Sequence, residues 1–138
     1  MASRSCPSEN GGFLQVSGLC YTIDTALPSC VTVDGKGMFV KIEGTRRIQN
    51  VQVYNSGSGT YEPISLTKIY TLASHNYMHK SAGDGINMFT NNRYLLEGIM
   101  IDNQVLINYI VDGLNGVVGA NYGDPHGQGR IVAVETAP

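Results

Sequence analysis

The stretch that decides the fold class is Phe13-Leu14-Gln15-Val16-Ser17-Gly18-Leu19-Cys20-Tyr21-Thr22-Ile23-Asp24. Apolar and polar residues alternate along it in two phases, and the phase changes at Gly18. A period of two predicts extended strands, and a glycine at the change suits a bend or a bulge. We therefore expect one strand over 13–17 and a second over 19–24. Phe13 is out of phase with the apolar residues that follow it, which leaves its ring free to face a cleft.

Four further strands are predicted downstream, at 38–42, 48–54, 69–74 and 129–135, the third of them a central strand because it is almost continuously apolar. Residues 56–60, Ser-Gly-Ser-Gly-Thr, indicate a hairpin or loop. One helix is expected to begin at Asp102, whose side chain can cap the first turn, and to stop at Asn115-Gly116. This order predicts an α+β fold, with a mixed, largely antiparallel sheet packed with helices.

Length and composition limit the classes of function. The 138 residues are enough for one domain, and 42% hydrophobic against 14% charged residues supports a packed core. The formal charge of −2 argues against a basic nucleic-acid groove, and no apolar run is long enough to span a membrane. Residues 1–11 are mostly small and polar, so we expect a tail there and the domain over 12–136.

The cysteines and histidines give little indication of redox or metal chemistry. Three cysteines are an odd number, and although Cys20 and Cys30 could meet across a loop, we expect three separate thiols. His75 and His79 would share one face of a helix and could hold zinc there. The glycines that follow oppose a helix, so we expect surface histidines and no metal site. No phosphate-binding loop or nucleophile elbow occurs, and no catalytic residue is predicted.

The candidate ligand-binding residues lie in one loop. Asn76 and Tyr77 come shortly before Gly83-Asp84-Gly85. Two glycines let the backbone turn sharply and approach a ligand closely, and the aspartate presents acceptors for paired sugar hydroxyls. The Tyr77 ring could stack on a flat base. The alternative is an ordinary Asp-Gly turn with Tyr77 in the core.

Six motifs occur in the order seen in the C-terminal, substrate-binding domain of the 5′-nucleotidases, a family that includes UDP-sugar hydrolases and 2′,3′-cyclic phosphodiesterases. The chain resembles that family's FLQVSG strand at 13–18, the Y-x-x-D that follows it at 21–24, and its R-V-x-x-V-x-V strand at 47–53. It is also similar to the Y-x-P-L motif at 61–64, to the tyrosine-led run into Asn76-Tyr77 and Gly83-Asp84-Gly85, and to GRI at 129–131. Ala82 departs from the pattern, because the family usually has a glycine there.

The resemblance implies that substrate binding and catalysis belong to two separate domains. In that family two aromatic rings clamp the base, which here match Phe13 and Tyr77, and an aspartate that matches Asp84 binds the ribose hydroxyls. A pair of divalent metals and the catalysis belong to a separate N-terminal domain, so we expect no cofactor in this chain and no activity from it alone. The resemblance further implies a secreted, cell-wall or periplasmic protein that takes part in nucleotide catabolism.

The main hypothesis is thus the nucleotide-specificity domain of a metal-dependent phosphohydrolase, with an N-terminal metallophosphoesterase domain and a nucleotide or nucleoside as its partners. The alternatives are a stand-alone nucleoside- or sugar-binding module, or an interaction domain whose cleft binds nothing. The family's domain begins well before the FLQVSG strand, so we expect an N-terminally truncated domain. Its open strand edges or an exposed apolar face predict self-association into a homo-oligomer.

Overall fold

The structure is a computed structural model that describes residues 2–4, 9–89 and 91–136. A four-stranded sheet has the order β5-β4-β1-β6. Its strands are β1 (Leu19–Asp24), β4 (Ile48–Asn55), β5 (Thr60–Pro63) and β6 (Ile131–Val134). β1 pairs antiparallel with β4 and parallel with β6, and β4 pairs antiparallel with β5. The fold is therefore α+β with a mixed, mostly antiparallel sheet, which confirms the expected fold class.

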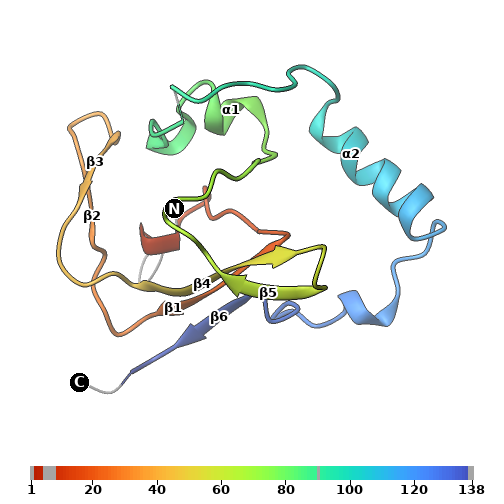
Figure 1. Cartoon of the computed structure of the whole chain (residues 1–138), viewed down its shortest axis with the longest axis horizontal. Helices are drawn as coiled ribbons and strands as arrows, with labels where there is room; N and C mark the ends of the chain where they lie inside the picture. Colours follow the sequence, from red (N-terminus) through yellow and green to blue (C-terminus); the bar gives the residue numbers. More distant parts are fainter. Residues whose placement is uncertain (1, 5–8, 90, 137–138) are drawn as a thin grey trace.

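A separate two-stranded hairpin and short helices complete the chain. The hairpin joins β2 (Val31–Val33) to β3 (Phe39–Ile42). The helical elements are η1 (Ala2–Arg4), α1 (Asn76–His79), η2 (Gly83–Gly85), α2 (Asp102–Asn108), the π-helical η3 (Tyr109–Gly113) and η4 (Ala120–Tyr122). Figure 1 shows α1 on the same side as the hairpin and α2 on the opposite side, with the sheet below both.

The predicted strand at 13–17 is wrong, because the first strand begins at Leu19. The Phe13 amide N–H donates instead to the Asn10 carbonyl at 3.0 Å, which closes a turn. Gly18 has a φ of +68°, so the predicted bend lies where the phase changes. The left-handed backbone at Gly18 separates the irregular segment before it from the ladder after it.

The predicted central strand at 69–74 is also wrong, because these residues form no strand. Ile69 is 95% exposed and Leu72 is 65% exposed. A continuous apolar run becomes a central strand only when strands pair with it on both sides. In the described structure β5 ends at Pro63 and no ladder includes 69–74.

The helix begins at Asp102, as expected, but the Asp102 side chain does not cap it. Ile101 is the N-cap, and Asp102 is the first helical residue. The Asp102 carboxylate accepts the N–H of Asn103 at 2.8 Å, so it acts inside the first turn, where a negative charge favours the helix dipole. The expected stop is confirmed, because Asn115 and Gly116 both have positive φ angles.

The core is small and draws on β1, on the residue before β2 and on the α1–η2 segment. Its buried hydrophobic residues are Tyr21, Ile23, Cys30, Met78 and Ile86. Cys20 and Cys30 are both free thiols, as expected, whereas Cys6 lies outside the described residues. Among the described residues, no helix combines the length and the hydropathy that a membrane crossing requires.

Buried polar groups attach the N-terminal turn to the sheet. Arg47 is 1% exposed and donates through Nε to the Asp24 carbonyl and through Nη1 to the Ser3 carbonyl, at 3.2 Å each. The Ser3 hydroxyl lies 3.2 Å from the Cys30 sulfur. Hydrogen bonds to a charged guanidinium stabilise more than neutral ones. The turn Ala2–Arg4 is thus held to the sheet by charge-assisted bonds.

The buried carboxylate of Asp24 makes stability depend on pH. The Thr136 hydroxyl donates to Oδ2 and the Ala26 N–H donates to Oδ1, and these bonds lower the pKa of Asp24, with Thr136 the largest cause. A lowered pKa stabilises the fold above the unfolded value of about 4, and this contribution is lost as pH falls through the folded value. Replacing Thr136 with valine should therefore lower the free energy of unfolding near neutral pH, and the deficit should shrink in acid. Urea titrations at about pH 6 and pH 3 measure it.

The matched control is Thr25→Val, which removes a hydroxyl that donates to the Val134 carbonyl and not to a carboxylate. Its deficit should be the same at both pH values. A Thr136→Val deficit that stayed constant with pH would show that the hydroxyl does not act through the titration of Asp24.

Candidate functional site

The candidate site is built on α1 and η2, which are joined by a short turn. Met78 of α1 and Ile86 after η2 are buried and anchor the two elements. Three of the four residues from Ala82 to Gly85 have positive φ, namely Ala82 at +52°, Asp84 at +52° and Gly85 at +79°. Ala82 thus adopts the left-handed backbone, which glycine adopts more readily.

Tyr77 and Asp84 meet above Gly83. The Tyr77 hydroxyl donates to Asp84 Oδ1 at 3.4 Å. A Cβ on Gly83 would lie 2.4 Å from Cε1 of Tyr77 and 2.6 Å from its carbonyl oxygen, so only glycine allows this approach. Tyr77 is 52% exposed. It therefore does not lie in the core, where the alternative interpretation places it. An open ring and an exposed carboxylate therefore stand side by side.

The rest of the turn is supported by the β2–β3 hairpin. A Cβ on Gly85 would lie 2.1 Å from the Gly37 carbonyl oxygen, so the two backbones are in direct contact. The Asn87 side chain donates to the Phe39 carbonyl at 3.0 Å. On the other side, Arg4 Nη1 donates to the Asp84 carbonyl at 3.2 Å. The backbone of the turn that carries Asp84 is thus held by contacts from elements far away in sequence.

The predicted residues are only partly brought together. Asn76, Tyr77, Gly83, Asp84 and Gly85 share the α1–η2 segment, where the Asn76 carbonyl accepts the N–H groups of Lys80 and Ser81. Phe13 lies half-buried in the segment before β1 and forms no ring pair with any described residue.

The ring beside Tyr77 is that of His75, which sequence reasoning did not assign to the site. Their centroids are 6.0 Å apart and their planes are 14° from parallel. His75 is the N-cap residue of α1 with an extended backbone, which places it two residues before Tyr77 on the same side. The sequence feature that indicates this ring pair is a histidine and a tyrosine separated by one residue at the start of a short helix.

Histidines do not gather into a metal site in the described part of the chain. No group of three or more His, Cys, Asp and Glu side chains lies close enough to hold an ion there. His79 Nδ1 is buried without a hydrogen-bond partner, and its ring lies 5.5 Å from that of Tyr94. His75 and His126 are exposed, as expected, whereas His79 is half-buried.

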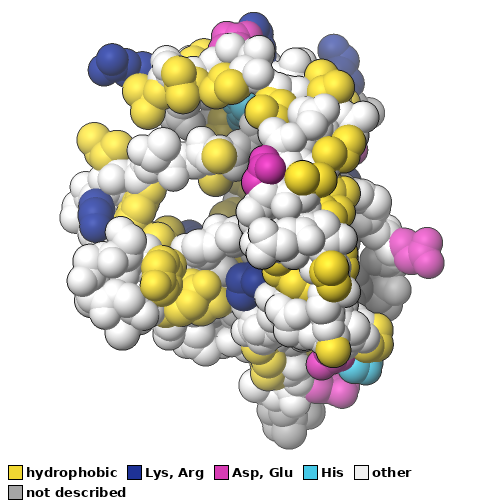
Figure 2. Space-filling view, turned by 90° about the vertical axis from the view of Figure 1, so that its right-hand side faces the viewer, with side chains coloured by type: hydrophobic (Ala, Val, Ile, Leu, Met, Phe, Trp, Pro, Cys, Tyr) yellow, Lys and Arg dark blue, Asp and Glu magenta, His cyan; other side chains and the backbone are white. Residues whose placement is uncertain are grey.

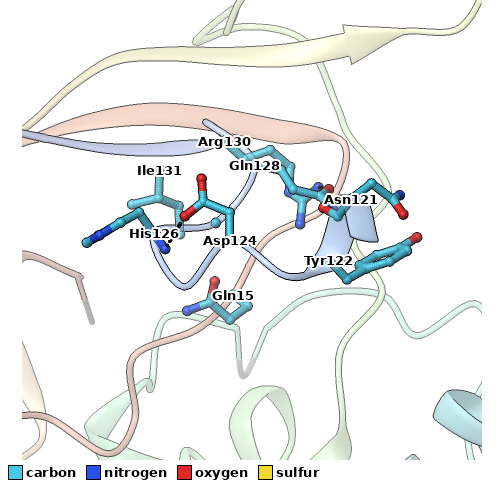
Figure 3. Close-up of a pocket in the computed structure, with 9 residues that line it drawn as sticks. Gln15, Asn121, Tyr122, Asp124, His126, Gln128, Arg130 and Ile131 are labelled. Carbon is cyan, nitrogen blue, oxygen red and sulfur yellow. Dashed lines mark hydrogen bonds between the residues drawn. The ribbon is translucent and has the colours of Figure 1, made fainter. Parts of the chain in front are cut away.

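A polar cavity of about 200 Å³ lies elsewhere, between the segment before β1 and the turn before β6 (Figure 3). Gln15 faces Asp124, whose Oδ1 accepts the His126 N–H at 2.8 Å. The Gln128 amide donates to the Asn121 carbonyl and accepts from Arg130. The side chains that line this cavity are mostly polar, which suits a polar molecule.

Tyr122, which lines the same cavity, is paired with Tyr109. The hydroxyls of Tyr109 and Tyr122 lie 2.7 Å apart, and this hydrogen bond raises the pKa of Tyr122. Sequence reasoning missed the cavity because Gln15 and the turn at 124–130 are distant in sequence. The turn itself was visible as Asp124-Pro125-His126-Gly127.

Comparison with known proteins identifies one family. A family model described as "5′-nucleotidase, C-terminal domain" matches residues 2–91, which is more than half of the chain. The match includes Phe13, Tyr77 and Asp84 and ends before α2. No curated protein and no solved structure matches the chain. The chain therefore belongs to the 5′-nucleotidase C-terminal domain family.

Proposed function

We propose that this chain binds the nucleoside part of a substrate, as the specificity domain of a 5′-nucleotidase-type phosphohydrolase. The observation that carries the proposal is the contact of an exposed Tyr77 ring with the Asp84 carboxylate on a turn that only Gly83 permits. A base has a flat face that stacks on an aromatic ring, and a ribose has two adjacent hydroxyls that a carboxylate can accept. One nucleoside can use both groups.

The hydrogen bond from Tyr77 leaves Asp84 available for this role. At 3.4 Å the bond lies at the long end of the usual range, so a ribose hydroxyl can replace it at little cost. The second carboxylate oxygen is open to accept the neighbouring hydroxyl. Two bonds from a rigid pair of hydroxyls orient the sugar as well as bind it. We propose Phe13 as a second ring that closes over the base.

In the whole protein, catalysis is proposed to belong to an N-terminal metallophosphoesterase domain with a pair of divalent metals. The described residues of this chain offer no cluster of metal-ligating side chains, and no catalytic step is assigned to them. Their contribution is to hold base and ribose so that the phosphate points away toward the other domain. Fixing a substrate in this way lowers the entropic part of the barrier. By resemblance, the protein is proposed to act outside the cytoplasm.

The test of this function is the dependence of binding on the ribose hydroxyls. Adenosine should bind the chain about 10- to 150-fold more tightly than 2′,3′-dideoxyadenosine, because hydrogen bonds to a charged group contribute about 1.5–3 kcal/mol. Calorimetric titration measures both affinities. Asp84→Asn should remove most of the difference.

The control variant is Asp124→Asn, which alters a carboxylate in the separate polar cavity. It should leave the preference for adenosine unchanged. Equal affinity for the two ligands in the unaltered chain would contradict the role of Asp84, and an effect of Asp124→Asn alone would move binding to the cavity.

A second prediction concerns activity. The isolated chain should not hydrolyse AMP, cyclic nucleotides or UDP-glucose with added Mg²⁺, Mn²⁺ or Zn²⁺, because it is proposed to bind without catalysing. Release of inorganic phosphate is the measurement. Turnover that survives repurification and disappears in Asp84→Asn would show that this chain carries catalytic groups of its own.

A further inference from the structure

The chain exposes far more surface than its mass accounts for. Its accessible surface is 10288 Å². A monomeric protein of 14.9 kDa is expected to expose about 7000 Å². The excess of about 3000 Å² in one chain is at least as large as the roughly 1000–2500 Å² that each subunit commonly buries in an obligate interface. Such an excess points to a face that is covered in the functional state.

Part of the exposed apolar surface lies around α2. Large apolar side chains from Leu95 to Val118 are exposed, and Figure 2, which faces this side of the molecule, shows hydrophobic atoms running down it. We define the α2 surface by six of these residues, which are 56–76% exposed: Leu96, Ile99, Ile101, Leu106, Val111 and Val117. A monomer rarely leaves an apolar patch of this extent open to water.

The helix itself needs a partner. Neither α2 nor η3 contains a buried residue, and together they span only Asp102–Gly113. An isolated helix this short is marginal in water, and helices in proteins are held mostly by packing of an apolar face. Val105, Leu106 and Ile107 are consecutive, so apolar side chains cover more than one side of the helix. This pattern is typical of a helix that is enclosed by neighbours.

The composition of the segment favours a second copy of the same chain. Residues 94–118 contain no Lys, a residue that is depleted at protein interfaces, and they carry only three acidic groups. Of the three acidic groups, Glu97 is paired with Lys80 and Asp102 accepts the N–H of Asn103. Little like-charge repulsion therefore opposes contact between two copies.

We propose that two copies of this chain pair through the α2 surface as a closed two-fold dimer. In a two-fold dimer the α2 surface of each copy covers that of the other. Neither surface is left open, so no further copies are added. The proposal is independent of the nucleoside site, because α2 shares no residue with it. It also replaces the expected pairing of open strand edges with helix packing.

Sedimentation equilibrium of the full 138-residue chain, from micromolar to hundreds of micromolar, is the test. The expected mass is twice 14.9 kDa. Leu106→Lys should weaken the dimer at least about tenfold, because it places two like charges in an apolar contact. Hydrogen exchange of the α2 amides should slow as concentration rises. The matched control is Leu66→Lys, at a residue that is 97% exposed outside the α2 surface, and it should have no effect.

Several outcomes would overturn the proposal. A monomer at every concentration would leave the α2 surface to a different partner. A mass that keeps rising beyond the dimer would indicate an open contact instead of a closed one. A dimer that Leu106→Lys leaves intact, or that Leu66→Lys weakens equally, would place the interface elsewhere. Circular dichroism of both variants checks that each retains the fold of the unaltered chain.

Discussion

Replacing Gly85 with alanine should destabilise the fold by about 3 kcal/mol or more, the largest effect that we expect from a single methyl group. Gly85 has a φ of +79°, where alanine is strained by about 1–2 kcal/mol. In addition, the new Cβ would lie 2.1 Å from the Gly37 carbonyl oxygen, a backbone atom that cannot rotate away. The η2 turn would have to separate from the hairpin. Urea unfolding of the two proteins measures the difference.

Gly44→Ala separates the two causes of this loss. Gly44 has almost the same φ, +77°, but a Cβ added there would meet no atom within 4 Å. Gly44→Ala should therefore lower stability only by what the left-handed backbone costs an alanine, about 1–2 kcal/mol. If both variants lose the same stability, the contact between η2 and the hairpin does not support the site.

Replacing Tyr77 with alanine should lower the affinity for adenosine by roughly 5- to 150-fold. Stacking of one base on one aromatic ring contributes about 1–3 kcal/mol by alanine substitution, and this range corresponds to that loss of affinity. Tyr77→Phe keeps the ring and removes only the long hydrogen bond to Asp84, so it should retain most of the binding. Calorimetric titration of the three proteins with adenosine gives the comparison.

The control for Tyr77 is Tyr61→Ala, which removes an exposed ring that packs edge-on against Tyr54 in the sheet. Its affinity for adenosine should equal that of the unaltered chain. If Tyr77→Ala binds adenosine as tightly as Tyr61→Ala does, the base does not stack on Tyr77. Phe13→Ala tests the second ring in the same way.

The parts of the fold that were predicted correctly are those that local pattern determines. The alternation in 48–54, the glycines of 56–60 and the helical period after Asp102 each correspond to an element of the structure. The errors at 13–17 and 69–74 have one cause. Strand formation depends on partners that are distant in sequence, and an apolar pattern does not show whether a partner is present.

The candidate site likewise has a part that the local sequence predicts and a part that depends on contacts between distant segments. The proximity of Tyr77 to Asp84 follows from a turn of only a few residues, and the glycines indicated it. The burial of Arg47 and Asp24 and the cavity at Gln15 depend on contacts between segments that are far apart in sequence. The relation of Phe13 to Tyr77 is of this second kind, because nothing between residues 13 and 77 fixes their distance from sequence alone.

The central claim is that one nucleoside occupies Tyr77 and Asp84 together. Nuclear Overhauser contacts between bound adenosine and the isotope-labelled chain test it most directly. We predict contacts from the adenine protons to the Tyr77 ring and from the ribose H2′ and H3′ protons to the residues on either side of Asp84. Contacts confined to the Gln128 and Arg130 side chains of the polar cavity would contradict the claim, as would adenine protons that approach no aromatic ring of the α1 segment.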